Sequence, residues 1–503
     1  MSTGAVFRVR LAPMLVLLAT TLGLWVAVVD ADRKPLWLDE LSTLLVASQP
    51  SVASYIRVQP VDAQPPLDAL LVHAALLLPL PLEISTRLPS MLGYVVAGWA
   101  IYLFVSRGGL RLGAAVAATS FLLGVAVQYA IEARPYALEM GLVGLVLVCW
   151  QGSIRSRNAR PWLVALVVAM AMLTLTQAFG FLFGAIPIAS GEFVRWRERR
   201  RFDWKIALSV AAGLLPIGFV VWLSARTKLL FLSRFHGETT GAAVPDLNSL
   251  AVTLFVVVGS HSFQILVMAA ICLVLLQDRP ATPSGPPKFE ASEWAAVSGV
   301  LLAALMCWGL AVVYTHYYFP RYGCATLVAI SILVGMGLSL WSGSLRNAIL
   351  WSSEAALVIA FAISAVLEAR MPYRSAAANS RAEALWSVPP DGLPIVVASA
   401  LDYQQVERYA PVSLQPRLIF VTDQARALRT SDFVPELVVD AYSDLGVLGS
   451  PVTNYDQFLQ KHRAFYVLSP GLPSEWLPDA LVREGMRRTK VKHTDSRVAL
   501  YQR

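Results

Sequence analysis

Charged residues are scarce in this sequence. Asp, Glu, Lys and Arg make up 15% of its 503 residues, whereas 56% are hydrophobic and the mean hydropathy is +0.58. Soluble globular domains carry about 25% charged residues, because their surfaces face water. The shortage of charge therefore excludes an ordinary soluble protein and predicts a polytopic membrane protein.

Cysteine and the common catalytic motifs are scarce too. The four cysteines fall in apolar segments and residues 368–503 contain none, so neither a disulfide framework nor a CxxC metal site is available. The sequence has no P-loop, no HExxH motif and no Ser-His-Asp set. These absences exclude the nucleotide-binding and hydrolytic sites that such motifs mark. The cysteines are Cys149, Cys272, Cys307 and Cys324.

Long apolar segments recur from residue 11 to residue 367, and each approaches the roughly 20 residues that cross about 30 Å of hydrocarbon. The first follows two arginines, as in a signal peptide, but no clear cleavage site follows Val29, so we expect it to be retained. The predicted fold class is a polytopic α-helical membrane protein, residues 1–367, with a C-terminal soluble α/β domain, residues 368–503. The eleven predicted spans are residues 11–29, 88–105, 112–129, 135–151, 161–176, 178–195, 206–224, 251–276, 294–315, 323–341 and 347–367.

Basic loops indicate the orientation. Lys and Arg concentrate in cytoplasmic loops, and the basic stretches fall on one side provided that residues 67–82 do not cross the membrane. That segment is short and contains Asp68, His73 and two prolines, which indicates a re-entrant or interfacial helix. The C-terminal domain then lies outside. If the segment crossed, the span count would change by one, and the side of the domain would change too unless another segment were reassigned. The basic stretches are residues 107–111, 155–160, 195–205, 278–288 and 342–346.

The net charge of +8 is explained largely by these loops, so no nucleic-acid partner is expected. The C-terminal part alternates short apolar runs with polar stretches of helical character, which predicts a small α/β unit. We predict strands at residues 395–398, 418–422, 464–468 and 497–501, and helices at residues 402–409 and 455–461.

Two adjacent carboxylates, Asp39 and Glu40, follow the first span within residues 36–42. Charge beside hydrocarbon is costly, so such a pair needs a reason. Neighbouring side chains on a helix point about 100° apart, which disfavours a proton-sharing dyad and predicts separate roles. Asp39 is a candidate general base that takes a proton from an acceptor. The alternative is structural: Asp39 caps a helix at residues 40–47, and Trp37 belongs to the interfacial aromatic belt.

Charged residues at later span boundaries are candidate phosphate ligands. Glu132 and Arg134 precede Pro135, which suits a first helical position. Arg134 can bind phosphate in a bidentate manner, with Glu132 orienting it or holding a divalent metal. Arg321 lies among aromatic residues at another boundary. The alternatives are an arginine that snorkels to the interface and an aromatic girdle. An expected outer loop, residues 225–250, carries further basic residues, which indicates an anionic ligand. These are Arg226, Lys228, Arg234 and His236.

The order of these motifs resembles the GT-C glycosyltransferases, in particular the dolichyl-phosphate-mannose-protein mannosyltransferase and aminoarabinose transferase relatives of family 39 type. The likeness runs through roughly residues 1–150 and continues in an Arg-Tyr element and the outer domain. The stretches that carry it are Trp37-Leu38-Asp39-Glu40, Gln64-Pro65-Pro66-Leu67 with His73, Arg87-Leu88-Pro89-Ser90, Glu132-Ala133-Arg134-Pro135-Tyr136-Ala137-Leu138 and Pro320-Arg321-Tyr322.

The resemblance implies a reaction and roles for these residues. Such enzymes transfer a sugar from a polyprenyl-phosphate donor on the outer face of the membrane. Asp39 is then the catalytic base with Glu40 beside it, and Glu132 lies at the donor phosphate or, with Asp39, holds a divalent cation, Mg²⁺ or Mn²⁺. Gln64 stands where the family often has His or Lys, and because Gln64 cannot carry charge, a phosphate contact made there in relatives is either weakened here or taken up by Arg87, Arg134 or Lys228. Asp68 stands where the family commonly has Tyr. The remaining candidate donor-binding residues are Arg87, Arg134, Tyr136, Lys228, Arg321 and Tyr322.

The sequence thus predicts a glycosyltransferase of the bacterial inner membrane, with its site and C-terminal domain on the periplasmic or extracellular side. Its expected partners are membrane lipids, the lipid-linked donor and an acceptor that is a protein, a lipid or a cell-wall glycan. A single carboxylate base predicts inversion at the anomeric carbon, because retention needs a second carboxylate as nucleophile. The alternative is a polysaccharide or lipid transporter, which predicts charges buried in mid-span; a membrane scaffold would leave the charged motifs unexplained.

Overall fold

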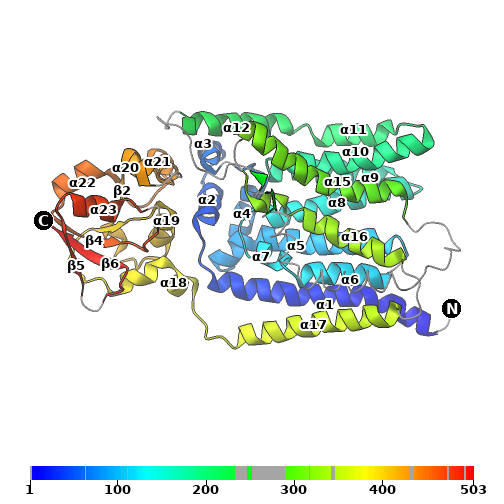
Figure 1. Ribbon diagram of the computed structural model, residues 1–503, viewed down its shortest axis with the longest axis horizontal. Helices are drawn as coiled ribbons and strands as arrows, with labels where there is room; N and C mark the ends of the chain where they lie inside the picture. Colours follow the sequence, from blue (N-terminus) through cyan, green and yellow to red (C-terminus); the bar gives the residue numbers. More distant parts are fainter. Residues whose placement is uncertain are drawn as a thin grey trace.

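The computed structural model describes residues 3–62, 64–109, 111–232, 246–247, 250–251, 289–315, 318–340, 346–430, 435–472, 475–491 and 494–503. It has two parts, a long helical body and a smaller α/β domain at one end of that body (Figure 1). The predicted fold class is confirmed. The last helix of the body, α17 (Arg346–Ala369), leads into the α/β domain.

The helical body is a bundle of apolar helices that run roughly along its length (Figure 1). Besides α17 the bundle contains α1 (Thr3–Arg33), α5 (Leu82–Ser106), α6 (Arg111–Leu122), α7 (Ala126–Ala130), α8 (Tyr136–Arg155), α9 (Arg160–Thr176), α10 (Gly180–Arg199), α11 (Trp204–Gly213), α12 (Ile217–Leu232), α15 (Ala291–Leu310), η1 (Ala311–Thr315), η2 (Pro320–Gly323) and α16 (Thr326–Leu340).

Two glycines let α5 and α8 approach closely. A Cβ atom on Gly93 would lie 2.4 Å from the Cα of Leu138, and one on Gly141 would lie 2.6 Å from the Gly93 carbonyl oxygen. Backbones can come this close in a membrane bundle only where side chains are small. The contact matters for the site, because α5 carries Arg87 and the loop that enters α8 carries Arg134.

Among the described residues, seven helices are long and apolar enough to cross a membrane, so the predicted count of eleven is not confirmed. The predicted span 112–129 is divided into α6 and α7 by a turn at residues 123–125, and α9 is apolar but only 17 residues long. Apart from Ala251, the predicted span 251–276 lies outside the described residues. The seven candidates are Leu11–Arg33, Leu82–Ser106, Tyr136–Arg155, Trp204–Leu229, Ala291–Val313, Pro320–Ser339 and Asn347–Leu367.

Three of the basic stretches meet at the end of the body away from the α/β domain. Arg155, at the end of α8, pairs with Glu293 in α15 at 2.5 Å and donates to the carbonyl of Arg107 at 2.9 Å. Arg199, at the end of α10, pairs with Glu290 at 3.1 Å. Their gathering at one end is what the positive-inside rule predicts for a cytoplasmic face.

The opposite end carries three short helices that do not cross the bundle, α2 (Leu38–Ala47), α3 (Val52–Asp62) and α4 (Leu67–Leu76). With ten residues, α4 is about 15 Å long, half of what a crossing needs. It packs against α2 and α5. The segment that was predicted to be re-entrant or interfacial is therefore a short helix at this end.

The α/β domain contains one mixed sheet of six strands in the order β3-β2-β1-β4-β6-β5. The first four in that order are parallel, and β6 runs antiparallel to both β4 and β5. Helices cover both faces, with separate apolar clusters on each. The strands are β1 (Ile395–Val397), β2 (Leu418–Thr422), β3 (Val452–Asn454), β4 (Ala464–Leu468), β5 (Arg487–Lys490) and β6 (Val498–Gln502). The helices are α18 (Ala376–Asn379), η3 (Arg381–Ser387), α19 (Ala400–Tyr409), η4 (Gln415–Arg417), α20 (Gln424–Thr430), α21 (Glu436–Asp444), α22 (Tyr455–Lys461) and α23 (Leu477–Arg483).

The α/β domain docks on the short helices through α19 and α21. Tyr409 in α19 accepts a hydrogen bond from the N–H of Leu36 at 3.0 Å and donates to Glu83 at 2.9 Å. Gln405 donates to the Leu36 carbonyl at 2.9 Å. Tyr442 of α21 joins an apolar cluster with residues of α2, α3 and α4. The domain therefore rests on the same helix that carries Asp39.

Candidate active site

Glu40 and Arg87 form a fully buried ion pair beneath the first turn of α2. Both side chains are 0% exposed. Arg87 Nε donates to Glu40 Oε1 at 2.8 Å and Nη2 donates to Oε2 at 2.7 Å. Arg87 Nη1 also donates to the carbonyls of Ala31 and Lys34, at 2.7 and 2.8 Å. A buried pair is tolerated only when such hydrogen bonds satisfy it. This pair joins the ends of α1, α2 and α5.

Glu40 also fixes two backbone segments. Its Oε1 accepts the N–H of Ala133 at 2.7 Å, and its Oε2 accepts the N–H of Trp37 at 3.2 Å. The second contact is the one that an N3 carboxylate makes to the residue before a helix. Helix α2 begins at Leu38, so the alternative in which Asp39 caps a helix at residues 40–47 is wrong. Glu40 is sealed away from solvent by these contacts.

Asp39 lies on the open side of the same turn, with its side chain 24% exposed. Its Oδ2 accepts a hydrogen bond from Arg321 Nη2 at 2.9 Å and lies 4.0 Å from Arg134 Nε. Arg134 Nη1 donates to the Asp39 carbonyl at 3.1 Å. The structure thus brings together α2, the loop before α8 and η2 at a single carboxylate.

Arg321 is held among aromatic rings. Its guanidinium carbon lies 4.5 Å from the ring centre of Phe319 and 5.5 Å from those of Trp37 and Tyr136. Tyr322 packs edge-on against the Phe319 ring. Cation–π attraction fixes a guanidinium without using its N–H groups. Within the described chain, the Nε of Arg321 is buried and has no hydrogen-bond partner.

Arg134 is held by an acid that the sequence did not single out. Arg134 is 4% exposed, and its Nη1 donates to Asp62 Oδ1 at 2.9 Å and to Thr43 Oγ1 at 3.1 Å. Its Nε, like that of Arg321, is buried without a partner among the described residues. Asp62 is the last residue of α3 and stands two positions before Gln64. That proximity to the Gln-Pro-Pro motif was the available signal.

Asp68 adds a second buried carboxyl beside Arg134. It lies in the first turn of α4 and is 3% exposed, and its Oδ1 has no partner in the described part of the chain. Burial raises the pKa of Asp68 to about 7; the Arg134 cation opposes this shift, and the Asp62 carboxylate adds to it. The site therefore contains a carboxyl that titrates near neutral pH.

Glu132 lies at the rim of the site. Its side chain is 26% exposed and its Oε1 is 3.9 Å from Lys34 Nζ. Burial raises the pKa of the Glu132 carboxyl, and the Lys34 ammonium acts in the opposite direction. The described residues contain no group of three or more His, Cys, Asp or Glu side chains placed to hold a metal. Because Asp39 is paired with Arg321 and Glu132 lies beside Lys34, these residues do not fit the expected Mg²⁺ or Mn²⁺ site.

The other predicted residues lie around this cluster. Tyr136 is buried beneath Arg321, and its hydroxyl has no partner among the described residues. The Gln64 carbonyl accepts a hydrogen bond from Gln59 at 2.5 Å, which shapes the turn between α3 and α4. Lys228 is exposed on α12, a helix that packs against α3. The start of the expected loop 225–250 is thus helical as far as Leu232. The predicted basic residues Arg234 and His236 lie outside the described residues.

No protein-family model matches the chain, and no curated protein matches it in sequence. Solved structures do. ArnT from Cupriavidus metallidurans in the apo state matches with a TM-score of 0.60 and 16% identity, over 99% of this chain and 98% of that one. The same protein bound to undecaprenyl phosphate matches with a TM-score of 0.59 and 15% identity, over 100% of this chain and 98% of that one. The chain therefore has the fold of ArnT along its whole length, the GT-C type that the sequence resemblance implied.

Proposed function

We propose that this protein is an integral membrane glycosyltransferase. It moves a sugar from a polyprenyl-phosphate donor to an acceptor on the side of the membrane where the α/β domain lies. The observation that carries the proposal is the cluster of Asp39 with Arg321 and Arg134 at one end of the helical body. The fold supports it, because the matching ArnT structure holds undecaprenyl phosphate.

The two arginines provide the site for the donor phosphate. Arg321 and Arg134 each keep a buried Nε–H donor that no described residue accepts. An unsatisfied buried donor is costly, so a ligand oxygen there recovers free energy. Guanidinium groups also bind phosphate oxygens strongly, and they stabilise the negative charge that grows on the leaving phosphate.

Asp39 acts as the general base once the donor is bound. In the structure its carboxylate accepts a hydrogen bond from Arg321 at 2.9 Å. A donor phosphate competes for the same guanidinium and frees the carboxylate. Asp39 then takes the proton of the acceptor while the acceptor atom bonds to the anomeric carbon and the bond from that carbon to the phosphate oxygen breaks. This single displacement inverts the anomeric centre.

Glu40 and Arg87 are positioning residues in this mechanism. Both are sealed from solvent, and together they fix the N-terminal turn of α2 and the backbone of Ala133, next to Arg134. The turn and the loop carry Asp39 and Arg134, so the buried pair sets the distance between base and cation. A catalytic group must be held within a fraction of an ångström to be effective.

In the direct test, the purified protein in lipid is incubated with labelled polyprenyl-phosphate sugars, and membrane extract provides the acceptor. The wild type is expected to transfer label with inversion, and Asp39→Asn is expected to lose about 10²- to 10⁴-fold in rate. Equal transfer by the two proteins would overturn the role of Asp39, and a retained anomer would overturn the single displacement. Transport, the alternative from the sequence, would move the intact donor across the bilayer without cleaving it.

A further inference from the structure

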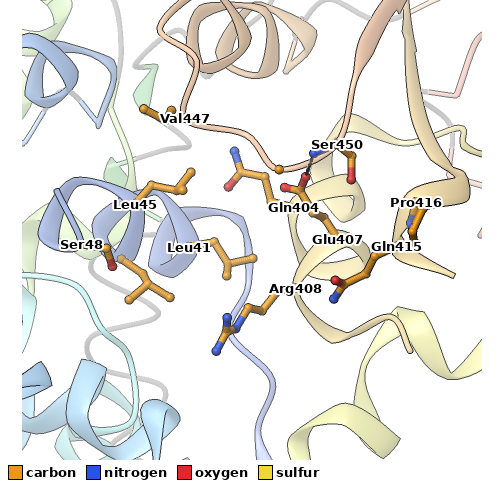
Figure 2. A pocket seen from close by; sticks show the side chains of 12 residues that line it. Leu41, Leu45, Ser48, Gln404, Glu407, Arg408, Gln415, Pro416, Val447 and Ser450 are labelled. Carbon is orange, nitrogen blue, oxygen red and sulfur yellow. Dashed lines mark hydrogen bonds between the residues drawn. The ribbon is translucent and has the colours of Figure 1, made fainter. Parts of the chain in front are cut away.

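A cavity of about 490 Å³ lies between α2 and the α/β domain. Its volume falls in the usual range for small-molecule sites, which favour boundaries between domains. One wall is apolar and comes from Leu41, Leu44 and Leu45 of α2. The other is polar and comes from α19 and the segments beside it (Figure 2). The polar side chains on that wall are Gln404, Glu407, Arg408, Gln415 and Ser450.

Gln404 is the unusual member of this wall. It is 3% exposed, yet neither its Oε1 nor its Nε2 has a hydrogen-bond partner among the described residues. Figure 2 shows its amide projecting between Leu45 and Val447. Buried side-chain amides are nearly always paired, so one with both atoms free needs an explanation. A ligand that both donates and accepts a hydrogen bond at this point would satisfy the two atoms together.

The charges beside Gln404 disfavour a ligand of net charge. Glu407 accepts the Ser450 N–H at 2.5 Å and presents a carboxylate, and the adjacent Arg408 presents an exposed guanidinium toward α2 (Figure 2). An anion would be repelled by the first group and a cation by the second. Hydroxyl groups suit both, because they donate to a carboxylate and accept from a guanidinium.

The cavity is separated from Asp39 by the body of α2. Successive residues of a helix are about 100° apart. Leu41 and Leu45 therefore point roughly 200° and 240° away from Asp39, on the opposite face. A molecule bound against these leucines cannot present a hydroxyl to the Asp39 carboxylate. The cavity is a site of its own.

We infer that this cavity is a second, non-catalytic binding site for a neutral sugar unit. Its hydroxyls pair with the Gln404 amide, the Glu407 carboxylate and the Arg408 guanidinium, and its C–H face rests on the leucines of α2. The inference stands on the cavity alone and does not depend on the proposed transfer reaction.

The test is binding of neutral sugars to the full chain in phosphatidylcholine nanodiscs, which avoid sugar-based detergents. Saturation-transfer NMR is run with glucose, mannose, galactose, arabinose and N-acetylglucosamine. We expect at least one of them to bind, and Gln404→Met to weaken that binding by about tenfold or more, through the loss of both amide hydrogen bonds. Gln460→Met is the matched control, because Gln460 is exposed on α22, away from the lining of the cavity.

Three outcomes would overturn the inference: no sugar binds, Gln404→Met binds like the wild type, or glycerophosphoethanolamine binds in a Gln404-dependent manner and the sugars do not. The melting temperature of Gln404→Met shows whether the variant is folded. Replacing a buried amide that has no partner among the described residues by Met should leave the melting temperature unchanged or raise it. Asp39→Asn should bind the sugar normally. Lost transfer with normal binding would count against neither site, whereas lost binding in Asp39→Asn would place the sugar in the active site and refute the inference.

Discussion

The start of α2 carries two adjacent carboxylates, and each is paired with an arginine. The two pairs have the same chemical groups but differ in solvent exposure and in hydrogen bonding. Glu40 and Arg87 are 0% exposed, and both form hydrogen bonds with other protein groups. Asp39 and Arg321 are 24% and 26% exposed, and the Nε–H of Arg321 has no acceptor among the described residues. The sealed pair can only hold structure, whereas the open pair can exchange partners with a ligand. Adjacent acids thus have separate roles because the fold buries one and exposes the other.

The largest test of this comparison is Glu40→Gln. It leaves the buried Arg87 without a counter-charge, and breaking a buried pair in this way costs about 3–5 kcal/mol. We expect a large fall in the melting temperature in lipid nanodiscs. Asp39→Asn breaks a partly exposed pair and should cost about 0–1 kcal/mol. Similar melting temperatures for the two variants would erase the distinction between the pairs.

The open pair is tested next by Arg321→Ala. Loss of a cation that stabilises a leaving phosphate should lower kcat about 10²- to 10³-fold, with little change in melting temperature. The assay is transfer from labelled polyprenyl-phosphate sugar. Arg487→Ala is the control, since Arg487 is exposed on β5. A fall in melting temperature as large as that of Glu40→Gln would show that Arg321 is structural instead.

Asp68 sharpens the comparison, because it is buried like Glu40 but its Oδ1 has no hydrogen-bond partner in the described part of the chain. Its pKa is raised from the ordinary range of an aspartate to about 7, chiefly by burial. Between about pH 4 and 7 the unfolded chain would carry the charge and the folded chain would not, so this group lowers stability as pH rises through that window. Asp68→Asn should remove a slope of at most about 1.4 kcal/mol per pH unit from the unfolding free energy. A pH profile identical to that of the wild type would show that Asp68 is paired.

The smallest expected effect is that of metal removal. Asp39 is paired with Arg321, and Glu132 lies beside Lys34. These two carboxylates therefore do not favour a resident divalent cation. Transfer activity should be the same in three samples: untreated protein, protein treated with EDTA, and EDTA-treated protein to which Mg²⁺ or Mn²⁺ has been added back. Activity that disappears and returns with the metal would show that the donor displaces Arg321 and supplies ligands of its own.

Particular strands and helices show how much of the fold could be predicted from the sequence. Strands β2 and β4 were predicted at their observed bounds, because both are apolar runs buried between helix layers. Strands β3 and β5 were missed, since they are short edge strands with no buried residue and no apolar pattern. The continuous helix expected at residues 112–129 failed for a related reason: hydropathy does not reveal the turn between α6 and α7.

In the candidate site, too, some residues could be predicted from the sequence and others could not. Asp39, Arg134 and Arg321 could be found, because charge at the edge of an apolar segment is unusual in itself. Asp62 was not singled out, because its local signal, a position two residues before Gln64, is weak, and its importance comes from its contact with Arg134 in another loop. The capping role assigned to Asp39 as an alternative belongs to Glu40, because the helix begins earlier than its charge pattern suggested.

By itself the sequence determined that this is a membrane protein with a terminal α/β domain and that its charged motifs stand at span boundaries. These properties depend on hydropathy and on neighbours along the chain. The tertiary structure alone decided which acid is sealed, which arginines have an N–H without an acceptor in the described chain, and where a cavity remains behind α2. Burial and pairing arise from contacts such as that of Asp39 with Arg321, 282 positions away, and no local pattern encodes them.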